Sequence, residues 1–213
     1  MRAMDRLDLT DYRLQVQSHY AKTRNSALPQ AERCNGFRQA RDELIGSHAQ
    51  SALSPEQKTL FKKLDYFAYD PSWRFLLDID EDVDLEILEI PLAEDGVFRM
   101  RRLGKVNFER EDQFYTLTLF WVLGYGGGIF LPFRDTSRLS GATYGGTRYL
   151  LDTIKGADLG QDDGKLILDF NYAYNPSCAY NPIWDCPLAP QENWLELSIP
   201  VGERAVPGSL NIF

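Results

Sequence analysis

The stretch QFYTLTLFWVLGYGGGIFLPF, residues 113–133, says most about the architecture because it is long, apolar and free of charge. A run of this length and composition resembles a membrane-spanning helix. Its four glycines and Pro132 oppose that interpretation, since glycine between β-branched and aromatic runs is typical of hairpins. We therefore predict two strands, 114–123 and 129–133, joined by the turn GYGGG. Apolar residues on both faces of the first strand indicate a central strand that is covered on both sides.

Further short runs of strand-forming residues follow from Trp73 onward. Turn-forming segments such as AEDG, SGATYGG and QDDGK separate them, and this pattern favours antiparallel sheets. The first third of the chain has helical periodicity instead. The fold class that follows is α+β, with amino-terminal helices and then a mainly antiparallel β-sandwich or partly closed β-barrel. The predicted strands are DLEILEI, VFRMRRL, KVNFER, FYTLTLFW, IFLPF, LILDFNYAY and WLELSIP.

Three helices are predicted before residue 72. The third has the clearest start, with Ser54 as N-cap, Pro55 in the first helical position and Gln57 completing a capping box. We expect it to end near Pro71, because the residue before a proline disfavours a helical conformation. The expected buried stripes are Tyr12, Val16, His19 and Tyr20, then Phe37, Ala40, Leu44 and Ile45, and finally Leu60, Phe61 and Leu64.

The length of 213 residues fits one domain with a sizeable core. We therefore expect a single domain over residues 1–213. It would consist of a possible helical arm at 1–34, a helical segment at 35–72 and a β-rich core at 73–213. The arm would pack on the sheet or on a second subunit, so a homo-oligomer is one of the alternatives.

The charge balance argues against two classes of partner. The chain has 31 acidic and 23 basic residues, and its net charge of -8 opposes attraction to nucleic acid and to anionic membrane surfaces. The opening MRAMDRLDLTDYRLQ carries charges from its second residue and lacks the apolar core of a secretory signal. We therefore expect a cytoplasmic protein that binds neither nucleic acid nor membranes.

The cysteines and histidines do not form a metal-binding pattern. Cys34, Cys178 and Cys186 are expected to be reduced thiols, although a bridge between the last two is sterically conceivable. His19 and His48 lie far from the cysteine pair in sequence, and a structural zinc site normally needs four such ligands. We therefore predict no metal and no cofactor.

The segment LILDFNYAYN, residues 166–175, alternates as a strand does. One face would carry Leu166, Leu168, Phe170, Tyr172 and Tyr174 into a core. The opposite face would carry a carboxylate and two amides, Asp169, Asn171 and Asn175. These polar groups would form a recognition surface, or they would hold the proline-rich loop that follows.

Two segments carry a family resemblance. DFNYAYNPSCAYNPIWDCPLAPQEN at 169–193 and IFLPFRDTSRLSGATYGGTRYL at 129–150 resemble the domain family of unknown function numbered 1684. The resemblance continues through 41–75 and IPVGER at 199–204, so it covers nearly all of the chain after about Arg33. Thr147 stands where the family motif usually has a glycine, and Tyr172 where arginine is common. The resemblance implies an uncharacterised prokaryotic protein with a largely β fold and no established activity.

Polar residues suited to an anion gather around two glycine-containing turns in residues 131–150. Arginine forks, a phenol and exposed backbone amides make a plausible anion-binding nest, although neither a phosphate loop nor a dinucleotide motif is present. The structural alternative is that Arg134 or Arg148 pairs with Asp135 or Asp169 to fix loops. The candidate ligand-binding residues are Arg134, Asp135, Tyr144, Arg148, Asp169, Asn171 and Tyr174.

Three classes of function fit these residues. The first is a small-molecule-binding domain with a polar and aromatic pocket for an anionic or polyhydroxylated ligand. The second is a metal-independent hydrolase or lyase, with Asp169 or Asp135 as base, Arg148 as electrostatic stabiliser and Glu192 as a further carboxylate to consider. The third is a protein interaction domain that uses the aromatic loop at 172–184. The sequence assigns no catalytic residue.

Overall fold

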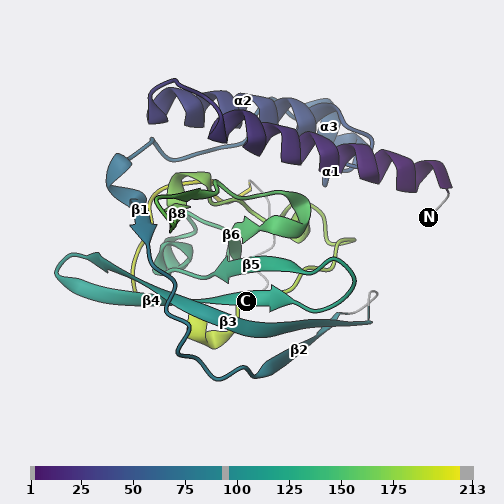
Figure 1. Cartoon of the computed structure of the whole chain (residues 1–213). Helices are drawn as coiled ribbons and strands as arrows, with labels where there is room; N and C mark the ends of the chain where they lie inside the picture. The colour runs from purple at the N-terminus through teal and green to yellow at the C-terminus, as the bar shows by residue number, and fades with distance from the viewer. Residues whose placement is uncertain (1–2, 93–95, 207–213) are drawn as a thin grey trace.

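The computed structural model describes residues 3–92 and 96–206, and three helices form one layer above the sheets (Figure 1). They are α1 (Ala3–Arg24), α2 (Gln30–Ser47) and α3 (Pro55–Leu60). The predicted stripes of the first two helices face the rest of the molecule. Tyr20 of α1 and Phe37 of α2 lie 4.7 Å apart between ring centroids, and the Phe37 ring lies 5.0 Å from Tyr172.

The start of α3 is confirmed, but its predicted length is wrong. Ser54 and Gln57 form both bonds of the capping box, and Pro55 begins the helix. The helix then ends at Leu60, whose side chain is 81% exposed, so the predicted buried stripe does not exist as a helical face. Leu64 is buried from the extended segment that follows, and its N–H is bound by the Asp42 carboxylate. A tertiary hydrogen bond from α2 thus replaces the next helical turn.

Two antiparallel sheets follow the helices. The smaller has the order β1-β8-β7, with β1 (Arg74–Leu77), β8 (Lys165–Asp169) and β7 (Gln161–Asp162). The larger has the order β2-β3-β4-β5-β6, with β2 (Ile87–Leu92), β3 (Gly96–Arg110), β4 (Gln113–Val122), β5 (Gly128–Phe133) and β6 (Arg148–Asp152). Among the described residues its two edge strands, β2 and β6, do not pair, so the sheet is not a closed barrel and the fold is a sandwich-like α+β structure.

Short 3-10 helices connect these elements. They are η1 (Pro71–Trp73), η2 (Thr136–Ser140), η3 (Thr153–Lys155), η4 (Phe170–Tyr172), η5 (Ser177–Ala179) and η6 (Gln191–Asn193).

The predicted hairpin at 113–133 is confirmed. β4 and β5 pair antiparallel, β4 is the central strand of its sheet, and residues 117–120 are all buried. The runs VFRMRRL and KVNFER, expected as two strands, form the single strand β3 with a bulge between Arg102 and Gly104. A shared core of large apolar side chains fills the space between the two sheets, among them Phe108, Leu119 and Phe133. No described helix has the length and apolar character that crossing a membrane requires.

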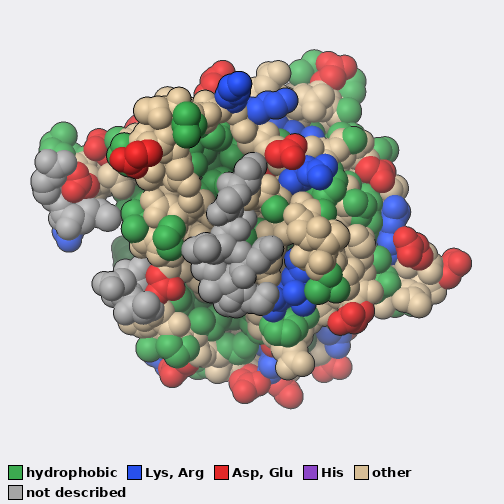
Figure 2. Space-filling view, turned by 180° about the vertical axis from the view of Figure 1, so that it is seen from behind, with side chains coloured by type: hydrophobic (Ala, Val, Ile, Leu, Met, Phe, Trp, Pro, Cys, Tyr) green, Lys and Arg blue, Asp and Glu red, His purple; other side chains and the backbone are tan. Residues whose placement is uncertain are grey.

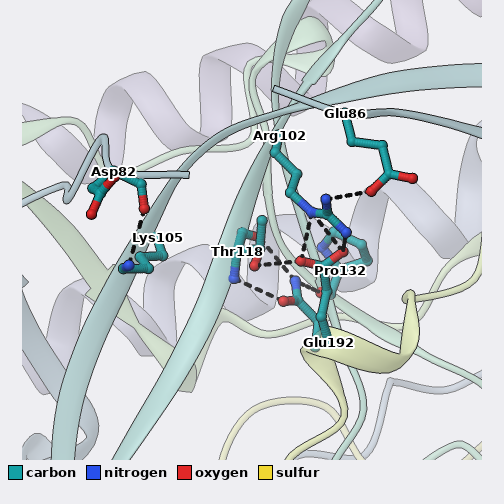
Figure 3. Close-up of polar contacts among 8 residues, drawn as sticks. Asp82, Glu86, Arg102, Lys105, Thr118, Pro132 and Glu192 are labelled. Atoms are coloured by element: carbon teal, nitrogen blue, oxygen red, sulfur yellow. Dashed lines mark hydrogen bonds and ion pairs between the residues drawn. The ribbon is translucent and has the colours of Figure 1, made fainter. Parts of the chain in front are cut away.

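The predicted strand WLELSIP is wrong, although two backbone hydrogen bonds tie this segment to residues 134–136: the Leu195 N–H donates to the Arg134 carbonyl at 2.7 Å, and the Thr136 N–H donates to the Leu197 carbonyl at 2.9 Å. This segment makes a single bridge, between Arg134 and Trp194. Next to it, the fully buried Asn193 accepts the N–H of Thr118 at 2.8 Å and donates to the carbonyls of Thr118 and Pro132 at 2.9 and 2.8 Å. Glu192 meanwhile holds the Arg102 guanidinium and the Thr118 hydroxyl, as Figure 3 shows. The side chain of Asn193 thus acts as a clip, a set of three hydrogen bonds that links η6 to β4 and β5.

Candidate functional site

A cavity of about 550 Å³ lies between the helical layer and one end of the five-stranded sheet. The loop at 174–187 closes its remaining side. Helix α1 can approach the sheet closely because Gly156, at the end of η3, has no side chain and adopts a φ of 69°; a Cβ atom there would lie 2.8 Å from Gln17 Cγ. Side chains from α1, α2, β3, β4, β5, β6 and the loop line the cavity, including Tyr12, Val16, Ile45, Phe98, Val122 and Phe130.

Aromatic rings build the sheet side of the cavity. The Phe130 ring lies 4.8 Å from that of Tyr149 and 5.7 Å from that of Phe98, measured between centroids. Tyr174 extends this wall, since its ring lies 5.8 Å from Tyr149 at nearly a right angle. The Tyr149 hydroxyl donates to the Pro187 carbonyl at 2.7 Å, which ties the loop to the wall. The wall is therefore rigid and largely apolar.

A buried ion pair lies at the polar floor of the cavity, where Arg41 lines the cavity and Glu203 lies behind it. Arg41 Nη2 lies 3.0 Å from Glu203 Oε2, and the guanidinium stacks 5.0 Å from the Tyr174 ring centroid. Glu203 is 1% exposed and also accepts the Tyr180 hydroxyl, the Asn175 backbone N–H and the Asn175 side-chain amide. Burial opposes the charge of Arg41, but the Glu203 carboxylate beside it raises the pKa of Arg41 above its ordinary value. The floor of the cavity thus contains charged groups, but the charges of Arg41 and Glu203 neutralise each other.

Four side chains lining the cavity carry a buried polar atom that has no hydrogen-bond partner within the described part of the chain. These atoms are Tyr20 Oη, Arg41 Nε, Asn175 Oδ1 and Trp184 Nε1. Nearly all buried polar atoms in folded proteins are paired with protein, water or a ligand. Burial raises the pKa of the Tyr20 phenol above its ordinary value, so this group stays neutral and both donates and accepts. All four atoms are themselves inaccessible to solvent, so they lie within the cavity wall and not at its surface.

Charges near the cavity are mostly paired. Lys155 Nζ lies 2.6 Å from Asp152 Oδ2, in addition to the pair between Arg41 and Glu203. Acidic and basic side chains are also interspersed over the molecular face in Figure 2. No cluster of three or more His, Cys, Asp or Glu side chains suited to a metal ion occurs among residues 3–92 and 96–206.

The structure brings Arg148 and Asp135 together, away from the lining of this cavity. Arg148 Nη2 lies 2.8 Å from Asp135 Oδ1, with the two side chains 1% and 3% exposed. Arg148 also donates to the backbone carbonyls of Ile199, Val201 and Glu203, at 3.0, 2.6 and 3.5 Å. This is one of the pairings expected under the structural alternative, and it ties the carboxy-terminal segment to β6.

Two further residues from the same motif also contact protein groups. Arg134 donates to the Gly145 carbonyl at 3.0 Å and stacks on Trp194, with its Cζ atom 4.6 Å from the ring centroid. The Tyr144 hydroxyl lies 3.8 Å from Cys178 Sγ. Neither side chain lines the large cavity. Thr147, which replaces a family glycine, is buried and accepts the Ala189 N–H at 2.8 Å.

Asp169 and Asn171 form a second cluster, because the predicted strand at 166–175 ends at Asp169 and η4 follows. Asp169 Oδ1 accepts both the backbone and the side-chain N–H groups of Asn171, at 3.0 and 2.8 Å. Asn171 in turn bonds both backbone groups of Asp70. Burial raises the pKa of Asp169, which lines a small cleft of about 50 Å³. Of the seven predicted ligand-binding residues, only Tyr174 lines the large cavity.

Sequence reasoning missed the residues that make the floor and its unpaired polar atoms. Arg41 and Glu203 are separated by 162 positions, and each lies in a segment that a one-dimensional pattern describes as an ordinary helix or loop. The sequence feature that could have indicated Glu203 was its position in the segment IPVGER, residues 199–204. There, Gly202 has a φ of 79° and packs so tightly that a Cβ atom would lie 2.7 Å from the Phe170 carbonyl oxygen. This close approach fixes the backbone next to Glu203.

Comparison with known proteins adds a family to this geometry. The model of the family described as "Protein of unknown function (DUF1684)" matches residues 59–204. The chain belongs to this family. The DUF1684 match begins at residue 59 rather than near Arg33, so it contains Tyr174, Tyr180 and Glu203 but not Tyr20 or Arg41. The sheet side of the cavity thus lies within the family segment, and the helical side lies before it.

A solved structure is similar to this DUF1684 chain. It is the solution NMR structure of an uncharacterized protein of Haloarcula marismortui, which is 29% identical and superposes with a TM-score of 0.58. The similarity covers 81% of this chain and 92% of that one. No curated protein matches the chain.

Proposed function

We propose that this protein binds a small molecule in the cavity between the helical layer and the five-stranded sheet. The observation that carries the proposal is a cavity of about 550 Å³ with mainly aromatic and aliphatic walls and a few polar side chains in its lining, among them Tyr20, Arg41 and Asn175. Ligand pockets typically have volumes of about 300–1,000 Å³, apolar walls and a few placed polar groups.

The lining indicates the chemistry of the ligand. The cavity walls are mainly aromatic and aliphatic, and polar side chains such as Tyr20, Asn175 and Ser177 are few. The floor charge is already balanced by Glu203, so an anion gains little there. We therefore expect a neutral, mainly apolar molecule. Binding is favoured over the hydrolase or lyase alternative because Asp135 and Arg148 are engaged with each other.

Filling the cavity should remove binding without unfolding the protein. Val16 of α1 lines the cavity, whereas Leu14, on the same helix, is 57% exposed and does not. The first readout is mass spectrometry of small molecules released by denaturing gently purified protein. The second is fluorescence titration with N-phenyl-1-naphthylamine, a neutral apolar dye. The wild type and Leu14→Phe should bind about one equivalent of dye, and Val16→Phe should bind at least about 10-fold more weakly.

Thermal melts provide the folding control, since all three proteins should melt cooperatively within a few degrees. Unchanged dye affinity in Val16→Phe would place the binding site elsewhere. Absence of both a released compound and saturable dye binding in the wild type would refute the proposal.

A further inference from the structure

The loop at 176–189 brings two cysteines into contact. Asn181 turns the chain, because its Oδ1 accepts the Ile183 N–H at 3.1 Å and its carbonyl accepts the Trp184 N–H at 3.2 Å. This turn returns Cys186 to Cys178, whose backbone N–H lies 3.4 Å from Cys186 Sγ. The two thiols also share a hydrogen bond, and both are free and partly exposed.

The two sulfurs have different surroundings. Cys186 Sγ accepts the Cys178 thiol and backbone N–H, and the first of these bonds is the main cause that lowers the pKa of Cys186 to about 7. The same shared proton raises the pKa of Cys178. Cys186 lines the large cavity, whereas Cys178 lies behind it, with its sulfur 3.8 Å from the Tyr144 hydroxyl. One thiol is therefore suited to attack an electrophile from the cavity, and the other to resolve the product.

The geometry points to a redox function: Cys186 is oxidised by a hydroperoxide, and Cys178 then closes an intramolecular disulfide with it. In the first step the Cys186 thiolate attacks the peroxide oxygen, the O–O bond breaks, and the leaving oxygen takes a proton to become an alcohol or water. Cys186 is then a sulfenic acid. In the second step Cys178 attacks the Cys186 sulfur, the S–O bond breaks and water leaves. Two thiols thus give two electrons to one peroxide, and a thiol reductant reverses the change.

The third cysteine provides an internal control. Cys34 is fully buried in the contact between α2 and η4, and burial raises its pKa to about 11. At pH 7 Cys186 should react with iodoacetamide at least about 100-fold faster than Cys34, because the thiolate is the reactive form. The rate at Cys186 should be half-maximal near pH 7, the pKa of its thiol.

The decisive experiment is treatment of the reduced full-length protein with hydrogen peroxide or cumene hydroperoxide, followed by alkylation and peptide mass spectrometry. The wild type should lose two hydrogens through a link between residues 178 and 186, and dithiothreitol should restore them. In Cys178→Ser, dimedone should trap a sulfenic acid at residue 186. In Cys186→Ser, Cys178 should stay a free thiol.

Three outcomes would overturn the inference: no oxidation of residue 186, a sulfinic acid there without a disulfide, or equally fast oxidation of Cys178 in Cys186→Ser. Should a variant fail to fold, the wild-type disulfide map and alkylation rates still decide. Neither measurement depends on a cavity ligand, so the result stands apart from the proposed binding function.

Discussion

At the scale of single residues, Arg148 is a buried charge that pairs with groups of the protein itself. Its side chain is among the largest that are fully buried, and its terminal nitrogens reach Asp135 and backbone carbonyls of the carboxy-terminal segment. The arginine, aspartate and glycine turns that suggest an anion-binding nest in the sequence thus serve to anchor that segment. The same residue types suit both roles, and only the position of the partner distinguishes them.

Removing Arg148 should therefore affect stability. Arg148→Met leaves Asp135 buried without its cation, and such losses cost about 3–5 kcal/mol of the free energy of unfolding. The matched control is Arg99→Met, because Arg99 and its partner Glu89 are each more than half exposed, and such pairs contribute less than about 1 kcal/mol. Urea denaturation followed by circular dichroism measures both. Equal effects of the two substitutions would contradict the assigned anchoring role.

At the scale of elements, local sequence patterns predicted the features that depend on interactions between residues close in sequence. The hairpin of β4 and β5 and the capping box of Ser54 were predictable because glycine turns and N-cap bonds depend on neighbours in sequence. The end of α3 and the lack of a strand at 194–200 were not. The Asp42 carboxylate binds the Leu64 N–H after α3, and the backbone of residues 195–197 bonds to Arg134 and Thr136, far along the chain. The secondary-structure propensity of a segment gives no information about such distant hydrogen-bond partners.

The clip made by Asn193 provides a test at this scale. Asn193→Ala removes three hydrogen bonds and leaves buried backbone groups of Thr118 and Pro132 unsatisfied. Each such group costs about 1–3 kcal/mol, so we expect a loss of at least about 2 kcal/mol in the free energy of unfolding. Asn107→Ala, at an exposed position on β3, is the control and should change stability by less than about 0.5 kcal/mol. A loss under 1 kcal/mol for Asn193→Ala, measured by denaturant titration, would argue against the clip.

At the scale of the whole molecule, the cavity lies between the helical layer and the five-stranded sheet. The helices are anchored by fewer buried side chains than the sheets are. Tyr20 and Thr23 are the only buried side chains among residues 4–24 of α1, whereas α2 buries five, including Phe37 and Ile45. The sheets share one continuous core. The cavity could not be foreseen from the sequence, because its walls come from segments as far apart as Leu9 and Pro187.

Hydrogen exchange should show that α1 and the sheets differ in the free energy of local opening. Amide protons of α1 should exchange at least about 100-fold faster than those of β4, because α1 opens locally at a smaller free-energy cost than the sandwich core. Helix α2 should fall between them and serves as the internal reference. Native-state exchange followed by mass spectrometry of peptic fragments measures all three. Simultaneous exchange of α1 and β4 would show instead that the molecule opens as one unit.

The pair between Arg41 and Glu203 has a consequence for biosynthesis. Its members are 162 positions apart, and translation adds about 5–20 residues per second, so roughly 8–30 s pass between the appearance of the arginine and of its counterion. During that interval Glu203 is not yet available to pair with Arg41. The nascent chain would therefore expose the aromatic side chains of its helices, including Tyr20 and Phe37, to solvent. The cavity therefore takes its final form late in synthesis.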